Sequence, residues 1–169
     1  MLLWAKTLQE LDFEALMGIY WEGNRENALD KYPNMELQAA HNRAEQDFYA
    51  YLRDEFFTQR GASYAVWVMD GNYVSALRLE PWEDGLLLEA LETHPNHRKK
   101  GYAKDLIKAV QESLPEIPVY SHVNKRNTPS LATHKSCGFQ ILKDTVRYLD
   151  GTVSAYGYTL LWQRKPLTE

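Results

Sequence analysis

Apolar residues recur at a helical spacing in the first third of the chain. The first such segment covers 8–21, with Asp12 as its expected N-terminal cap, and the second covers 37–57. Apolar residues in both segments recur at intervals of three or four, as expected for a helix that buries one face. The sequence therefore predicts two helices before any strand.

Strands and helices alternate through the rest of the chain. Short segments rich in β-branched and aromatic residues are separated by Asp-Gly or Asp-Gly-Asn turns and by two further helical segments. The order α-α-β-β-β-α-β-α-β-β indicates an α/β (α+β) fold with a mixed sheet covered by helices, in which 86–123 forms a right-handed parallel crossover. The predicted strands are 64–69, 73–79, 86–93, 118–123, 139–148 and 152–162, and the two later helices are 101–114 and 128–137.

Length and composition favour one folded domain over 1–169. The chain is 44% hydrophobic and 25% charged, close to the average for globular proteins. Its one cysteine, Cys137, cannot form an internal disulfide and indicates a reducing compartment. No apolar run approaches the roughly 20 residues that span a bilayer, and the N-terminus lacks the features of a signal peptide. We therefore expect a cytoplasmic protein with no membrane partner.

Charge is unevenly distributed along the chain. The net charge of −4 argues against nucleic acid as a partner, because such binding depends on neutralising phosphates. Residues 1–57 hold 5 basic and 11 acidic side chains, a net charge of −6, whereas 94–108 hold 5 basic side chains and 1 acidic one, a net charge of +4. The basic segment surrounds Gly101, and phosphates bind at such places.

The segment Arg98-Lys99-Lys100-Gly101-Tyr102-Ala103 lies between a predicted strand and a predicted helix. Gly101 can adopt a positive φ, and the small Ala103 permits close approach of a ligand to the backbone. Amides at the start of the helix would then bind an anion, helped by the helix dipole. Neither GxxxxGK[ST] nor GxGxxG occurs in the chain. The segment is therefore either a phosphate loop of another kind or a solvated basic helix start.

A second motif decides between these two interpretations. Asn127-Thr128-Pro129-Ser130 opens a helix 24 residues after Ala103, and that helix ends in Cys137-Gly138-Phe139. Together the two segments resemble the GNAT superfamily of acyl-CoA-dependent N-acetyltransferases, which carries a [Q/R]-x-x-G-x-[G/A] loop and then N-x-x-[A/S], a helix and G-F. The resemblance implies a mixed, mostly antiparallel central sheet of about six or seven strands flanked by helices, with a short first strand as an option.

The resemblance also implies acetyl-CoA as co-substrate. Amides of 99–104 would hold its pyrophosphate, and the backbone of 91–93 would pair with the pantetheine arm where two strands diverge. The implied cofactor-binding residues are Leu91, Thr93, Arg98, Lys99, Lys100, Gly101, Tyr102, Ala103, Lys104, Asn127 and Ser130.

Three residues are candidates for acid–base catalysis. His134 stands where the family often has a tyrosine that protonates the leaving thiolate, and an imidazole can donate a proton near neutral pH. The alternative is a histidine that only packs or is solvated. Glu92 is the first candidate for the general base and Glu89 the second, and strand alternation places them on opposite faces. An ordinary structural role stays open for either carboxylate.

No metal site is expected. His94 and His97 have no Cys or carboxylate partner at ligand spacing, and Cys137 is interpreted as a buried, inert thiol.

The acidic first third suggests a cationic primary amine as acceptor, either a small molecule or a peptide. Tyr20, Glu22 and Asn24 are its candidate binding residues, and a solvated acidic helix pair is the alternative. We therefore expect direct transfer of an acetyl group from acetyl-CoA to such an amine in a ternary complex. Two alternatives stay open: a non-catalytic acyl-CoA sensor, and an interaction domain that forms a homodimer through the final strands.

Overall fold

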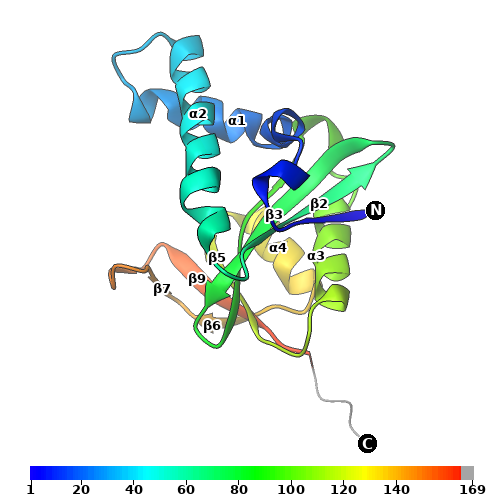
Figure 1. The fold of residues 1–169 in the computed structure, drawn as a ribbon. Coiled ribbons are helices and arrows are strands. Elements are labelled where there is room, and N and C mark those ends of the chain that lie inside the picture. Colours follow the sequence, from blue (N-terminus) through cyan, green and yellow to red (C-terminus); the bar gives the residue numbers. More distant parts are fainter. Residues whose placement is uncertain (165–169) are drawn as a thin grey trace, which may run out of the picture.

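A seven-stranded sheet with helices on both faces forms the centre of the molecule in the computed structural model (Figure 1). The structure describes residues 1–164, so the last five residues of the predicted domain, 165–169, lie outside it. The strand order is β1-β2-β3-β4-β5-β9-β6, with β4 and β5 parallel and the other neighbours antiparallel. The strands are β1 (Leu2–Ala5), β2 (Ser63–Met69), β3 (Asn72–Trp82), β4 (Gly85–Thr93), β5 (Val119–Asn124), β6 (Gln140–Lys143) and β9 (Gly157–Trp162).

The predicted fold class is confirmed. The sheet is mixed and mostly antiparallel, and the short first strand is present as β1, which pairs with β2. The parallel pairing of β4 and β5, which are joined through a helix, confirms that the predicted connection is a parallel one. The four helices are α1 (Phe13–Lys31), α2 (Leu37–Asp54), α3 (Tyr102–Ser113) and α4 (Thr128–Ser136).

The first helix differs from its prediction at both ends. Residues Leu8–Glu10 form a short 3-10 turn, and α1 begins after Asp12, whose side chain accepts a hydrogen bond of 3.0 Å from the amide of Ala15. The helix then continues to Lys31, ten residues beyond the predicted end at position 21. The added turns are mostly polar and exposed, so they carry no apolar periodicity from which the sequence could predict them.

The final pair of strands is also shorter than predicted. The segment 139–148 contains β6 and the two-residue strand β7 (Val146–Arg147), and 152–162 contains β8 (Val153–Ser154) and β9. β7 and β8 form a separate two-stranded sheet. The Thr159 hydroxyl donates a hydrogen bond of 2.7 Å to the Thr145 carbonyl, and this contact ties the chain between β6 and β7 to β9.

Two apolar cores lie on opposite faces of the sheet. Alternate residues of β2 and β3 serve each face: Tyr64, Val66 and Ala76 pack with α1 and α2, whereas Ala65 and Leu77 pack with α3 and α4. This alternation follows from the period of two along a strand. In the described part of the chain, no helix is both long enough and apolar enough to cross a membrane.

β4 and β5 separate after a short stretch of pairing. Their register runs from Leu86 opposite Val119 to Leu88 opposite Ser121, and no pair is formed beyond these residues. β5 remains paired with β9 up to Asn124, and β4 remains paired with β3 up to Thr93. The sheet therefore opens between the ends of β4 and β5.

Candidate functional site

A cleft of about 650 Å³ lies beside the separated end of β4, between the start of α3 and α4. Ten of the eleven predicted cofactor residues line it, and the exception is Lys100. Four α4 residues not predicted from the sequence, Pro129, Ala132, Thr133 and Ser136, also line it. These four residues recur at intervals of three and four, so the helical face that begins at Pro129 would have identified them. The full lining is Leu91, Glu92, Thr93, His97, Arg98, Lys99, Gly101, Tyr102, Ala103, Lys104, Asn127, Pro129, Ser130, Ala132, Thr133 and Ser136.

Gly101 forms the turn that opens α3 towards this cleft. It is the N-cap of the helix and adopts the left-handed conformation, with φ 82° and ψ 8°. The first intrahelical bond runs from the Asp105 amide to the Gly101 carbonyl, so the amides of 102–104 have no partner within the helix. A Cβ built at Gly101 would meet no heavy atom within 4 Å, which shows that the turn is open. Together with Lys99 and Lys104, these amides form a site that fits a phosphate group.

Asn127 is the N-cap of α4, the helix that its motif was expected to open. Its side-chain oxygen accepts a hydrogen bond of 3.2 Å from the amide of Ser130 at the start of α4. Both residues line the cleft, so the second motif lies opposite the loop around Gly101.

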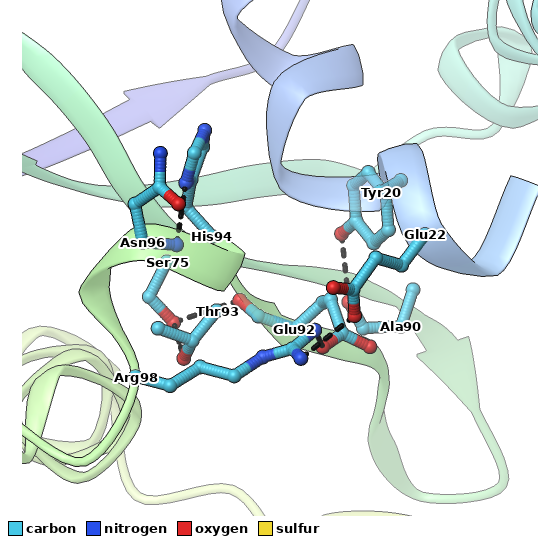
Figure 2. A network of polar contacts seen from close by, with 9 residues as sticks. All are labelled: Tyr20, Glu22, Ser75, Ala90, Glu92, Thr93, His94, Asn96 and Arg98. Atoms are coloured by element: carbon cyan, nitrogen blue, oxygen red, sulfur yellow. Dashed lines mark hydrogen bonds and ion pairs between the residues drawn. The ribbon is translucent and has the colours of Figure 1, made fainter.

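Arg98 connects the loop to two carboxylates on other elements (Figure 2). Its guanidinium lies 2.7 Å from a carboxylate oxygen of Glu22 on α1 and 3.4 Å from one of Glu92 on β4. Burial raises the pKa of Glu92, and the Arg98 charge opposes that shift. Glu22, a predicted acceptor residue, and Glu92, a predicted base, are therefore both paired with Arg98.

A bulge in β4 overturns the expectation that Glu89 and Glu92 lie on opposite faces. Glu92 pairs with Ala76 and Glu89 with Arg78, so β4 holds one more residue than β3 between these pairs. Ala90 lies in this bulge with a φ of 53°, a left-handed conformation that is rare for a residue other than glycine. The extra residue resets the alternation, and both carboxylates point to the face covered by α1 and α2.

Tyr20 contacts this bulge directly. Its hydroxyl donates a hydrogen bond of 2.7 Å to the Ala90 carbonyl and accepts one of 3.0 Å from the Tyr64 hydroxyl (Figure 2 shows the contact with Ala90). Burial raises the pKa of Tyr20 and raises that of Tyr64 to about 12, so both phenols stay protonated. The side-chain nitrogen Nδ2 of Asn24 lies 3.7 Å from the Met17 sulfur. None of Tyr20, Glu22 and Asn24 is among the residues that line the cleft.

Glu89 lies in a different environment from Glu92. One of its carboxylate oxygens is 3.6 Å from Nε of Arg78, and burial raises the pKa of Glu89 to about 7. Arg78 lowers that pKa, and Glu80 raises it further. Glu89 does not line the cleft.

His134 is buried on the inner face of α4 and is not among the cleft residues. Its Nδ1 donates a hydrogen bond of 2.7 Å to the Ser130 carbonyl, which can only accept. Its Nε2 is 2.9 Å from the Ser121 hydroxyl, which therefore donates to the neutral ring. Burial lowers the pKa of His134. The imidazole is thus held as a neutral group with both nitrogens engaged.

Cys137 is buried, and burial raises the pKa of its thiol. Among residues 1–164, no three His, Cys, Asp or Glu side chains are grouped so that they could hold a metal ion.

The comparisons with known proteins agree with this geometry. The acetyltransferase (GNAT) family model matches residues 16–139, whereas no curated protein matches the chain. Solved structures with the same fold include the PaiA N-acetyltransferase of Thermoplasma acidophilum in complex with coenzyme A, with a TM-score of 0.64, 11% identity, and coverage of 97% of this chain and 99% of that chain. Spermidine N-acetyltransferase of Vibrio cholerae, in complex with CoA and spermine, has a TM-score of 0.61, 16% identity, and coverage of 96% and 95%.

A third structural neighbour is the ribosomal-protein-S18-alanine N-acetyltransferase of Escherichia coli, with a TM-score of 0.57, 13% identity, and coverage of 100% of both chains. At such identities these structures indicate a shared fold, whereas the family match extends over most of the chain and includes both cleft motifs. The chain therefore belongs to the GNAT acetyltransferase family.

Proposed function

We propose that the protein transfers an acetyl group from acetyl-CoA to the primary amine of a cationic small molecule or peptide, by direct attack in a ternary complex. The observation that carries this proposal is the cleft formed by the separated end of β4, the left-handed turn at Gly101 and the start of α4. An anion-binding turn next to an unpaired strand edge suits a ligand that has both a diphosphate and an amide-containing arm.

Each part of the cleft would hold a different part of acetyl-CoA. The free amides of 102–104 would bind the pyrophosphate, and Lys99 and Lys104 would add charge. The backbone of Leu91 and Thr93 would hydrogen-bond the pantetheine arm in the manner of an added strand. Ser75 on β3 helps to hold this part of the β4 backbone. Its hydroxyl donates a hydrogen bond of 2.9 Å to the Glu92 carbonyl and lies 3.2 Å from the Thr93 hydroxyl (Figure 2).

Proton removal from the amine needs a base, and the two glutamates differ in how well they fit. Glu92 is paired with Arg98, an interaction that favours its ionised form but occupies an oxygen. Glu89 has a pKa near neutrality, which suits a group that must accept and release a proton at physiological pH. We therefore place Glu89 ahead of Glu92 as the base. His134 stays a proposed proton donor only if its ring can leave Ser121 and Ser130.

The acceptor would be attracted by the acidic α1–α2 region. Structural neighbours are named for acetylating spermidine and a ribosomal-protein alanine, so the fold itself accommodates small-molecule and peptide amines.

Calorimetry with CoA and a thiol-release assay with a panel of primary amines test this function. We expect CoA to bind and acetyl-CoA to release thiol only when an amine is present. Lys99→Ala and Lys104→Ala should weaken CoA binding several-fold, whereas Lys108→Ala, which removes an equal charge outside the cleft, should change it little. Failure to bind CoA would refute the proposal, and binding without thiol release would favour the sensor alternative.

A further inference from the structure

A second cavity, of about 700 Å³, lies where β3, β4 and β5 meet the segment 147–150. Its polar and aromatic lining includes Glu80, Trp82, Glu89, His122, Arg147 and Asp150. The β4 part of this lining differs from that of the first cleft, because Glu89 belongs to this cavity and Leu91 to the other. Glu89 shares its sheet face with Arg78, which packs against α2, whereas Leu91 packs with the core under α3 and α4.

The two cavities lie along the same opening in the sheet. Leu88 and Ser121 form the last pair between β4 and β5, and the next residues on each strand are Glu89 and His122. Both of these line the second cavity, whereas Leu91 and Thr93, further along β4, line the first. An amine bound beside Glu89 would therefore approach the opening from the side opposite the proposed acetyl-CoA site.

One buried polar atom in the second cavity lacks a partner within the described residues. Nε2 of His122 is buried and forms no hydrogen bond, whereas Oε1 of Glu89 lies 3.6 Å from Nε of Arg78. The His122 ring lies edge to face against Trp82, with ring centroids 5.2 Å apart and an interplanar angle of 87°. Buried groups of this kind are costly unless something satisfies them. A ligand that donates a hydrogen bond would satisfy Nε2 of His122.

The charge of the lining identifies the kind of ligand. Three carboxylates, on Glu80, Glu89 and Asp150, line the cavity with one guanidinium, on Arg147, and a second guanidinium outside the lining, on Arg78, pairs with Glu89. Leu87 and Leu149 add apolar surface, and Trp82 offers an aromatic face that can hold a cation. With Arg78 and Arg147 both counted, the carboxylates leave an excess of one negative charge next to apolar walls. This matches an aliphatic chain with one ammonium group in addition to the amine that reacts. It does not match an amine that carries a carboxylate.

We propose that this second cavity is the acceptor site and that it takes an aliphatic diamine or polyamine. One amino group lies beside Glu89 and His122 and is acetylated, and a second ammonium group stays near Glu80 and Asp150. This inference rests on the proposed acetyl transfer. It moves the acceptor away from the sequence-based candidates Tyr20, Glu22 and Asn24, none of which lines the cavity.

The reaction balances with the groups named. The bound ammonium gives one proton to the Glu89 carboxylate, and the neutral nitrogen attacks the thioester carbonyl carbon. The N–C bond forms as the C–S bond breaks, and the second nitrogen proton ends on the sulfur of CoA. Glu89 then returns its proton to solvent.

A matched pair of substrates tests the inference. Butane-1,4-diamine and butylamine have the same carbon chain and differ only in the second amino group. We expect kcat/KM for the diamine to exceed that for butylamine by at least tenfold. Glu80→Gln and Asp150→Asn should each reduce this preference several-fold while leaving the KM for acetyl-CoA unchanged. Glu116→Gln, at an exposed position outside both cavities, is the charge-matched control and should keep the preference.

Two readouts separate the inference from the function on which it rests. Equal kcat/KM for the two amines, or a preference for 4-aminobutanoate, would overturn the inference while acetyl transfer stands. If CoA binds but no amine is acetylated, the proposed function fails. Calorimetry with butane-1,4-diamine on the CoA-loaded protein then decides whether the second cavity binds a diamine. Diamine binding that Glu80→Gln weakens would support the cavity, and absence of diamine binding would overturn it.

Discussion

Glu89 and Glu92 point to the same face of β4 although they are three residues apart. The bulge at Ala90 causes this arrangement, because it inserts one residue opposite β3 and reverses the alternation. The two carboxylates have different partners: Glu92 pairs with Arg98 on the loop before α3 and Glu89 with Arg78 beneath α2. One irregularity therefore gives β4 two acidic groups on one sheet face, of which Glu92 also borders the first cleft and Glu89 lines the second cavity.

Gly101→Ala should impair both the stability of the turn and the binding of CoA. The φ of 82° is unfavourable for alanine, so we expect the free energy of unfolding to fall by about 1 kcal/mol. The added methyl would project into open space at the turn, where the proposed pyrophosphate would lie. Calorimetry should show CoA affinity reduced by tenfold or more.

Gly23→Ala is the matched control for that variant. Gly23 lies inside α1, and a Cβ there would also meet nothing within 4 Å. Because the helical conformation suits alanine, this change should raise the free energy of unfolding by roughly 0.5–1 kcal/mol and leave CoA affinity unchanged. Equal CoA affinity in the two variants would argue against a phosphate site at Gly101.

Tyr20→Phe should loosen the bulge at Ala90. The change removes the donor to the Ala90 carbonyl and the acceptor of the Tyr64 hydroxyl. We expect the free energy of unfolding to fall by about 1–2 kcal/mol, because buried groups lose their partners. If the bulge orients Glu89, kcat should also fall, with the KM for acetyl-CoA little changed. Tyr156→Phe, at an exposed position, is the control in both denaturation and kinetic assays.

Local sequence was sufficient to predict two segments that line the first cleft, and non-local contacts explain what it missed. The loop around Gly101 and the Asn127 cap depend on a few consecutive residues, so their motifs identify them. The second cavity joins Glu80, Glu89 and His122 to 147–150, segments that come together only after the sheet forms. The bulge at Ala90 could not be predicted because the sequence has no glycine there, the usual signal of a bulge. Its position depends on the register with β3 and on the hydrogen bond from the Tyr20 hydroxyl.

The raised pKa of Glu89 predicts opposite effects of pH on activity and on stability. With a pKa of about 7 in the folded protein and 4.5 as its ordinary value, the folded state binds more protons than the unfolded state between these values. The free energy of unfolding contributed by Glu89 should therefore fall as pH rises from 4.5 to 7. As a base, Glu89 must be ionised, so kcat/KM should rise towards a plateau above pH 7.

Glu89→Gln separates these two effects. The groups that face Glu89 are Arg78 and Glu80 on β3 and Tyr51 on α2, and the variant leaves all of them in place. Urea denaturation at pH 5 and pH 8 should show a smaller loss of stability for the variant than for the wild type. Its kcat should be at least 100-fold lower at pH 8, and Glu92→Gln provides the comparison. Loss of activity only in Glu92→Gln would make Glu92 the base.

His134→Phe should affect stability more than catalysis. The variant leaves the buried Ser121 hydroxyl without its acceptor, so we expect the free energy of unfolding to fall by about 1–3 kcal/mol. Because the neutral ring directs its Nδ1 proton to the Ser130 carbonyl, it has no proton free for a thiolate, and kcat should change less than twofold. Adding Ser121→Ala should recover part of the lost stability, since the double variant removes both partners. A kcat that falls 100-fold with unchanged stability would instead establish His134 as the proton donor.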